Sequence, residues 1–423
     1  MSILRLFAII MIFGTVSLAW MALGGTMWAR TEMLDDSLSQ EMASLWGPEV
    51  LVQTSPWWSP QRHSERGKGV SVAPAASKIT ADIRHEHRYK GLLWYNTFAV
   101  TFSAEYSIPA VEAEADGFFI FHLPEGITSH DGLHMAVDGK DVNIPVEQKQ
   151  TGKLSVPLAR DAEHVVSIAF TTYGQDVWLY APAEVSSGHS WEYDEGVIST
   201  SGTMTELKDF SLTITTNFPN INYPKGARSP IEKADPDDGG MSASWQYVSS
   251  VTNQAMGIEM PPRPNAGPTC ARMSFFAPVS LLFFITVLFT VVVLKKVPLH
   301  PMHYLFISAG FFAFHILLAY LVDVVENIHS AFWICSAVSV FLVVSYMRLV
   351  AGVKFAVAYV GLAQLVYLVG FSYAFFWPGK TGLTVTIGAI ATLFVLMQAT
   401  GKVRWAEVLR KRDTVVTAPP SRQ

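Results

Sequence analysis

The chain has 423 residues, of which half are hydrophobic and only 15% are charged, so it is too apolar to be a purely soluble protein. Two cysteines exclude a disulfide framework and a cysteine-rich zinc module, and a net charge of −5 argues against nucleic acid as a partner. Residues 30–272 hold 18 Lys and Arg against 31 Asp and Glu, whereas the rest of the chain carries a net +8. The charge therefore separates an acidic region from a basic, apolar one.

The first apolar run, Leu6–Trp28, is long enough to cross a bilayer, which takes about 20 residues. A cleaved signal peptide is the alternative, with small residues at Gly24 and Gly25, but its apolar region would be about 7 to 15 residues long. We therefore expect residues 1–29 to form a retained anchor. Residues 31–45 are expected to continue it as a short helix.

Residues 30–272 read as a β-rich domain, because short alternating segments are separated by Gly, Pro, Asn and Asp. Asp138-Gly139 predicts a tight hairpin turn, and residues 53–80 predict a long loop. Segments with this spacing and no long helix between them favour an all-β, sandwich-like domain. The further strand candidates are Leu92–Tyr106, Phe118–His122, Val165–Tyr173, Leu207–Thr216 and Ser242–Ser249.

Residues 273–400 predict a bundle of five more transmembrane helices, and residues 401–423 a cytoplasmic tail. The predicted helices are Ser274–Leu294, His303–Val322, Ala331–Met347, Phe355–Trp377 and Gly382–Thr400. The fold class is thus a six-helix membrane protein with a large outer domain.

The positive-inside rule orients these helices by the Lys and Arg residues near their ends. If the helices alternate in direction, one side receives Arg5, Lys295, Lys296, Arg348, Lys354, Lys402, Arg404, Arg410, Lys411 and Arg412. Among the short loops, only Lys380 lies on the other side. Both termini are therefore expected in the cytoplasm of a bacterium, and residues 30–272 in the periplasm.

The start of the third predicted helix carries a recognisable motif. Leu299-His300-Pro301-Met302-His303-Tyr304-Leu305 resembles the Leu-His-Pro-Met-x-Tyr-Leu signature of CreD-type bacterial inner-membrane proteins, the cell-envelope integrity family. The outer domain adds weaker matches: Gly47-Pro48, Thr216-Asn217-Phe218-Pro219, and the spaced Gly240, Ala243, Trp245 and Ser249.

The chain also departs from the family pattern. Where the family has Phe-Tyr and later a Ser-Glu-His-like end, this chain has Phe314-His315 and Val322-Asp323-Val324. The acid is kept as Asp323, but no histidine stands at position 324. The resemblance therefore implies an inner-membrane location and a part in envelope integrity rather than a particular reaction.

The candidate functional residues are His300, Pro301, Tyr304, His315, Asp323 and Glu326. Ionisable groups inside a bilayer are costly and are functional candidates by default. For His315 we favour a neutral imidazole bonded to a neighbouring helix through Ser339, Ser345 or Gln364, with a proton-relay or ligand role as the alternative. The other residues have structural readings: helix initiation for the first three, and loop charges for the two acids.

Cofactor and metal sites are not expected. Two histidine pairs, His85 with His87 and His130 with His134, lack a third ligand in view. A disulfide between Cys270 and Cys335 is not favoured. Hydrolase, phosphate-loop and dinucleotide motifs are absent from the sequence, so we expect no enzyme activity.

Three functional classes follow. The leading one is a non-enzymatic envelope protein whose β domain binds another envelope component, protein or lipid, or senses stress. The second is a transporter or lipid-handling bundle that uses His315 and the outer-edge acids. The third is a membrane-embedded hydrolase, which lacks paired catalytic motifs. The lipid bilayer is a partner in each case, and the sequence does not fix the oligomeric state.

Overall fold

The computed structural model describes residues 3–61, 71–90, 93–113, 115–126, 129–182, 192–194, 197–199, 204–235, 239–263, 265–325, 327–377 and 379–401. The chain divides into two compact units. Met1–Asp35 together with Pro264–Gln423 form one, here called the membrane unit. Asp36–Arg263 form the other, here called the β unit.

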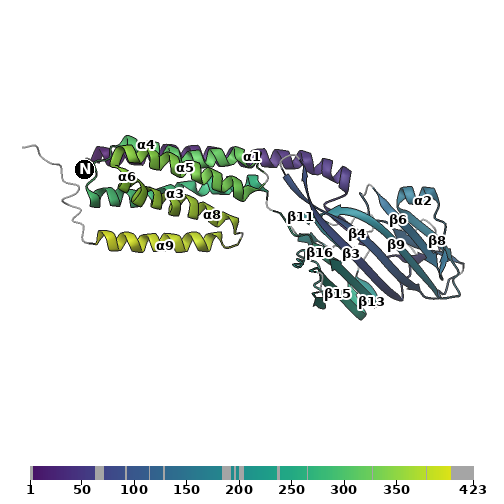
Figure 1. Ribbon diagram of the computed structural model, residues 1–423. Helices are drawn as coiled ribbons and strands as arrows, with labels where there is room; N and C mark the ends of the chain where they lie inside the picture. The colour runs from purple at the N-terminus through teal and green to yellow at the C-terminus, as the bar shows by residue number, and fades with distance from the viewer. Residues whose placement is uncertain are drawn as a thin grey trace, which may run out of the picture. The chain divides into compact units, whose positions relative to one another are not determined.

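Six helices of the described chain are long and apolar enough to cross a membrane, as the sequence predicted. They are α1 (Ile3–Trp46), α3 (Ala266–Lys295), α4 (Pro301–Leu321), α5 (Ile328–Ala351), the fifth span (Val353–Phe376) and α9 (Thr381–Thr400) (Figure 1). The unbroken course of α1 to Trp46 confirms the predicted helical continuation over residues 31–45. Within the membrane unit, the N-terminus lies at the same end as α6, the first turn of the fifth span.

The fifth span is irregular along its length. It consists of α6 (Val353–Phe355), a π-helical segment η1 (Ala356–Gly361), α7 (Leu362–Gln364), a second π-helical segment η2 (Leu365–Gly370), α8 (Phe371–Tyr373) and a final 3₁₀ turn η3 (Ala374–Phe376). Runs of π-helix are rare and often occur at functional sites. This span therefore differs from its five neighbours in the pitch of its backbone.

Local sequence sets the helix ends. The Asn327 side chain caps α5, because its Oδ1 accepts a hydrogen bond from the His329 amide at 2.9 Å. Gly352 ends α5 with a φ of +84°, a conformation that glycine adopts without strain. The next helix begins immediately at Val353.

The β unit is built on an eight-stranded mixed sheet in the order β14-β15-β13-β3-β4-β9-β6-β7 (Figure 1). Its strands are β3 (Ala76–Lys90), β4 (Leu93–Ile108), β6 (His130–Val137), β7 (Lys140–Asp141), β9 (His164–Gln175), β13 (Thr205–Thr216), β14 (Glu232–Ala234) and β15 (Met241–Thr252). β13 runs parallel to β3, and the other neighbouring pairs are antiparallel.

Two smaller sheets complete the main core. One joins β1 (Val50–Thr54), β10 (Val177–Ala181) and β16 (Met256–Glu259), and the other joins β2 (Trp57–Ser59), β5 (Gly117–His122) and β8 (Lys153–Leu158). A separate pair consists of β11 (Glu192–Asp194) and β12 (Val197–Ser199). One hydrophobic cluster holds Phe102 and Trp245 of the large sheet together with Phe121 and Trp178 of the small ones.

The strand candidates are confirmed, and so is the hairpin turn, in which Asp138 and Gly139 adopt φ of +50° and +74°. The second hairpin strand, expected over residues 140–146, is shorter and ends at Asp141. The loop predicted for residues 53–80 is wrong in part. It contains β2 and the start of β3, because Trp57 and Trp58 are buried in the strand that pairs with β5. The domain is not purely β either, since a short helix α2 covers Val146–Thr151. Pro56 and Pro60 obscured β2, whereas α2 has only six residues and is too short to show a helical period.

Candidate functional site

The recognised motif forms the start of α4. His300 is the N-cap, and its Nδ1 accepts a hydrogen bond from the Met302 amide at 3.3 Å. Pro301 occupies the first turn, where a missing N–H costs no helical hydrogen bond. The Tyr304 side chain is buried in the core of the membrane unit. All three residues therefore help to initiate or anchor this helix.

His315 lies in the middle of α4 and is 3% exposed. Its Nδ1 donates to the Phe311 carbonyl, one turn earlier, at 3.2 Å. Its ring packs edge-on against Trp20 of α1, with 5.5 Å between the ring centroids. The expected partners on α5 and the fifth span are wrong, because the nearer backbone carbonyl of the same helix accepts the hydrogen bond from Nδ1. The Nε2 atom has no hydrogen-bond partner among the described residues.

The two buried polar residues expected to meet His315 bond each other instead. The Gln364 side chain donates from Nε2 to Ser339 Oγ at 2.9 Å, and Ser339 donates to the Gly310 carbonyl at 2.7 Å. This chain of bonds joins the fifth span, α5 and α4. It satisfies polar groups that hydrocarbon cannot, which makes it a helix-packing device.

Asp323 follows the end of α4 and pairs with a cation of α1. Arg30 Nη2 lies 2.8 and 2.7 Å from the two Asp323 carboxylate oxygens. The sequence predicted only an ordinary loop charge at Asp323 and missed this ion pair, because Arg30 lies 293 positions away along the chain. The other predicted acid, Glu326, lies outside the described residues.

The candidate residues do not gather into one site. His300 and Asp323 stand beyond opposite ends of a 21-residue helix, which is roughly 30 Å long. His315 lies between them and contacts neither of their partners among the interactions described above. These candidate residues therefore make three separate structural contacts along α4.

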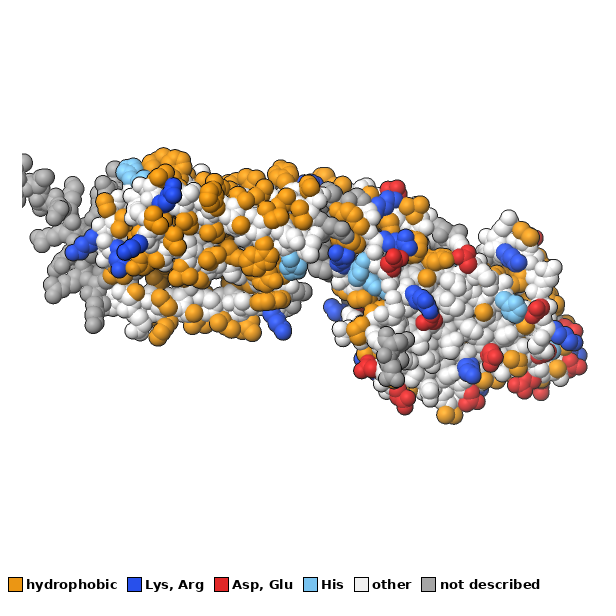
Figure 2. All heavy atoms as spheres, in the orientation of Figure 1, with side chains coloured by type: hydrophobic (Ala, Val, Ile, Leu, Met, Phe, Trp, Pro, Cys, Tyr) orange, Lys and Arg blue, Asp and Glu red, His pale blue; other side chains and the backbone are white. Residues whose placement is uncertain are grey.

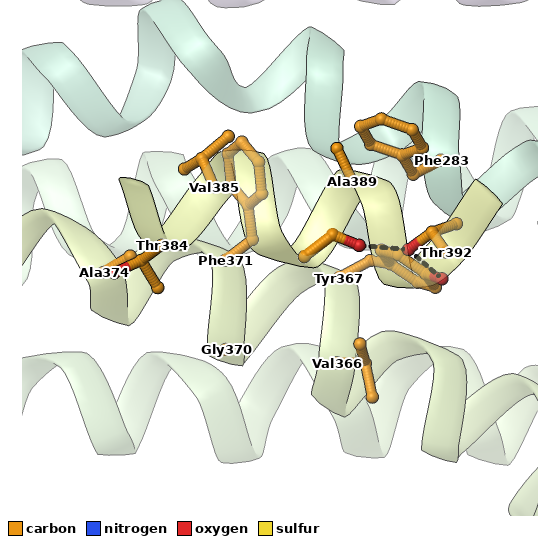
Figure 3. Close-up of a pocket in the computed structure, with 11 residues that line it drawn as sticks. Phe283, Val366, Tyr367, Gly370, Phe371, Ala374, Thr384, Val385, Ala389 and Thr392 are labelled. Atoms are coloured by element: carbon orange, nitrogen blue, oxygen red, sulfur yellow. Dashed lines mark hydrogen bonds between the residues drawn. The ribbon is translucent and has the colours of Figure 1, made fainter. Parts of the chain in front are cut away.

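A small cavity of about 190 Å³ lies between α3, the fifth span and α9 (Figure 3). Its wall includes Phe283, Phe371 and Thr384, and a hydrogen bond of 2.8 Å joins Tyr367 Oη and Thr392 Oγ1 beside it. The Thr392 hydroxyl also lies 2.7 Å from the Gly388 carbonyl of its own helix. Sequence reasoning missed this cavity, because the small residues that leave it open carry no chemical signal of their own.

In the β unit, His85 and His87 lie side by side on β3, with 4.4 Å between their ring centroids. Burial, with the neighbouring His87, lowers the pKa of His85 to about 4. Burial also lowers the pKa of His87, whose Nε2 lies 3.1 Å from the Pro261 carbonyl oxygen. His134, by contrast, pairs with Asp141 at 2.9 Å. These histidines hold strand and linker contacts.

Across the described ranges, no three His, Cys, Asp or Glu side chains cluster closely enough to hold a metal ion. Cys270 and Cys335 are both buried and unbridged. The arrangement offers hydrogen bonds and packing but brings no nucleophile together with a base among the candidate residues.

Residues 227–406 match the family model of the inner membrane protein CreD. No curated protein matches the chain. Among solved structures, the chain is similar to a candidate nutrient binding protein from Legionella pneumophila, with 10% identity and a TM-score of 0.26 over 56% of this chain and 76% of that one. The family match covers the last strands of the β unit and the five helices that follow. The match to the inner membrane protein CreD thus covers part of a chain that combines six candidate membrane-spanning helices with a β-rich domain.

Proposed function

We propose that this protein contributes to cell-envelope integrity or the envelope stress response by binding an envelope component through its periplasmic β domain. The observation that carries the proposal is the outer face of the eight-stranded sheet. Thr215, Asp82, Thr101 and Thr171 stand in register across four adjacent strands. Thr215 donates to Asp82 at 3.0 Å, and the Thr101 and Thr171 hydroxyls lie 3.3 Å apart. This polar row offers hydrogen-bonding groups to a partner.

The shared core supports a two-layer arrangement of the domain. Ile79, Val100 and Phe102 of the large sheet belong to the same cluster as Phe119 and Trp178 of the two small sheets. Alternating residues of β4 are buried while their neighbours are exposed, which is the pattern of a sheet with one solvated face. We propose a sandwich in which the polar row faces outward.

Charge supports the proposed orientation. The cations at the ends of α3 and α5 and in α6 are Lys295, Lys296, Arg348 and Lys354, and Figure 2 shows Lys and Arg gathered at the end of the membrane unit where α6 lies. At the other end, Arg30 is paired with Asp323. The positive-inside rule favours a cytoplasmic position for the cluster of cations at the α6 end.

Packing of α1 supports its retention as an anchor. Trp20 is fully buried against Phe312 and His315 of α4. A Cβ built on Gly24 would lie only 3.0 Å from the Phe275 ring of α3. A helix that fits its neighbours this closely has a structural role in the mature protein.

The proposal includes no enzyme activity. Ser336 and Thr290 bond backbone carbonyls one turn earlier in their own helices, and His315 does the same. Asp323 is engaged by Arg30, so the transporter alternative, which uses His315 and the outer-edge acids, gains no support from this arrangement.

Photo-crosslinking in intact cells tests the binding proposal. A photoreactive residue at Thr101 of the full chain should give a discrete adduct with an envelope component, identified by mass spectrometry. The matched control carries the same group at Val146, which is 69% exposed on α2. A second probe position is Thr213, on β13 of the same sheet. Identical adducts from Thr101 and Val146, or no adduct from either Thr101 or Thr213, would count against a binding surface on this sheet.

Cysteine labelling tests the topology independently. A single cysteine introduced at Thr101 in a variant lacking Cys270 and Cys335 should react with a membrane-impermeant reagent added outside the inner membrane. One at Lys296 should react only after the membrane is permeabilised. The reverse result would overturn the orientation.

A further inference from the structure

An apolar groove runs between α5 and the fifth span. It has a volume of about 1060 Å³ and is open on one side. The side chains that form its rim are exposed, among them Phe341 (71%) and Leu362 (59%). In a membrane-embedded unit, such a groove opens onto lipid rather than water.

Small residues and the π-helical segments account for this space. Ser336 and Ala337 of α5 and Ala358 and Gly361 of η1 all line the groove, and none of these side chains is long enough to fill it. The two helices still approach closely at one point, where a Cβ on Gly361 would lie 3.1 Å from Val344 Cγ2. The groove is therefore bounded by packed helix rather than by a loose interface.

The two ends of the groove differ in chemistry. At one end Trp333 lines the groove, and its ring lies 5.8 Å from that of Tyr373. The His329 and Phe376 rings lie 4.5 Å apart in the same part of the two helices. At the other end lies Arg348, which lines the groove, is exposed and pairs with no acid in the described part of the chain. Lys354 is exposed nearby, in the turn that follows.

The length suits a lipid tail. From Trp333 to Arg348 the α5 helix rises roughly 22 Å, whereas one leaflet provides about 15 Å of a hydrocarbon core about 30 Å thick. An acyl chain that starts at the Arg348 end can therefore lie in the groove for its whole length. Its headgroup would meet the cations where the chain leaves the hydrocarbon.

We infer that this groove is a binding site for an anionic phospholipid, with one acyl chain between α5 and the fifth span and the phosphate at Arg348. Charge complementarity selects the occupant. The membrane end that carries Arg348 also carries Lys295, Lys296 and Lys354, and the described residues at that end include no acid. A guanidinium binds phosphate oxygens through two parallel donors. The inference requires only that these helices span a membrane and is independent of what the β domain binds.

Native mass spectrometry of the purified full chain tests the site. The protein is equilibrated in detergent with phosphatidylglycerol or with phosphatidylcholine of the same acyl chains. We expect about fivefold greater retention of phosphatidylglycerol, the effect of one cation near an anionic lipid. Arg348→Gln should abolish this preference. Lys380→Gln, the same charge change at an exposed residue outside the groove, should leave it intact.

A second variant tests the contribution of the groove to lipid binding separately from that of the surface charge. Ala337→Leu fills the groove and should reduce retention of both lipids, and a thermal unfolding curve in detergent checks that the variant is folded. Equal retention of the two lipids by the unaltered protein would overturn the inference, as would identical behaviour of Arg348→Gln and Lys380→Gln. So would unchanged phosphatidylglycerol retention in folded Ala337→Leu. Displacement of phosphatidylglycerol by an equal amount of a polyprenyl phosphate would overturn the proposed occupant.

Discussion

The two units place polar and apolar side chains in opposite ways. In the membrane unit, Phe341 and Leu349 are 71% and 78% exposed, while Ser339 and Gln364 are fully buried. In the β unit, Trp245 and its apolar neighbours form the core, and hydroxyl groups cover the outer face of the large sheet. The surrounding solvent explains the difference, since burial of apolar surface stabilises a domain only where the alternative is water.

Buried polar groups differ in whether their partners lie in the same element or in another one. In the membrane unit, Thr290 and Ser336 bond carbonyls of their own helices, at Thr286 and Phe332, whereas Ser339 bonds the Gly310 carbonyl of α4. In the β unit, the Trp245 indole donates to the Arg228 carbonyl at 2.9 Å, from a separate segment of the chain. The Trp245 indole therefore holds a tertiary contact, and loss of this large buried side chain should cost more stability than loss of a hydroxyl that bonds its own helix.

The largest effect is expected at Trp245. Trp245→Ala in a fragment covering residues 30–268 should lower the free energy of unfolding by about 3–5 kcal/mol, because it leaves a cavity and removes an indole hydrogen bond. Chemical denaturation followed by circular dichroism measures the loss. Val248→Ala, at an 84% exposed position of the same strand, is the control and should change little. Equal midpoints for the two variants would show that the Trp245 contact contributes no net stability.

An intermediate effect is expected from pH. Burial lowers the pKa of His85 to about 4, with a smaller contribution from His87, and burial with Lys153 lowers that of His122 to about 4. Since the unfolded chain takes up these protons near pH 6.5, the β unit should lose stability as the pH falls from about 6.5 to about 4. Allowing for partial exposure, the loss is on the order of 1–2 kcal/mol.

Denaturation midpoints of the same fragment at several pH values check this dependence. The double substitution His85→Gln and His122→Gln should flatten the curve in that window. His134→Gln, at an exposed position, is the control. A slope that survives the double substitution would assign the pH dependence to other groups.

The smallest effect is expected at His315. The imidazole N–H of His315 donates its hydrogen bond within its own helix and not to another helix. His315→Gln and His315→Leu should therefore change the free energy of unfolding by less than about 1 kcal/mol, the range of polar contacts between membrane helices. Thermal unfolding in detergent and protein abundance in membranes measure this. Wild-type abundance with complete loss of an envelope-stress phenotype in both variants would instead assign His315 a functional role.

Periodicity made most of the secondary structure predictable. Runs such as Leu6–Trp28 and the alternation along Leu207–Thr216 carry their own signal, and the Asp138-Gly139 turn follows from the conformations those two residues accept. The short strand at Trp57–Ser59 escaped prediction, because Pro56 and Pro60 resemble loop punctuation and the strand exists only through its pairing with β5.

The sequence by itself therefore determined the number of apolar helices, the separate β-rich region and the motif at the start of α4, since each depends on neighbouring residues. Only the tertiary structure decided which residues meet. Arg30 finds Asp323, Gln364 finds Ser339 rather than His315, and a groove opens beside Gly361. Such contacts join helices that are distant in the chain. Their geometry depends on how whole helices pack, which local patterns do not encode.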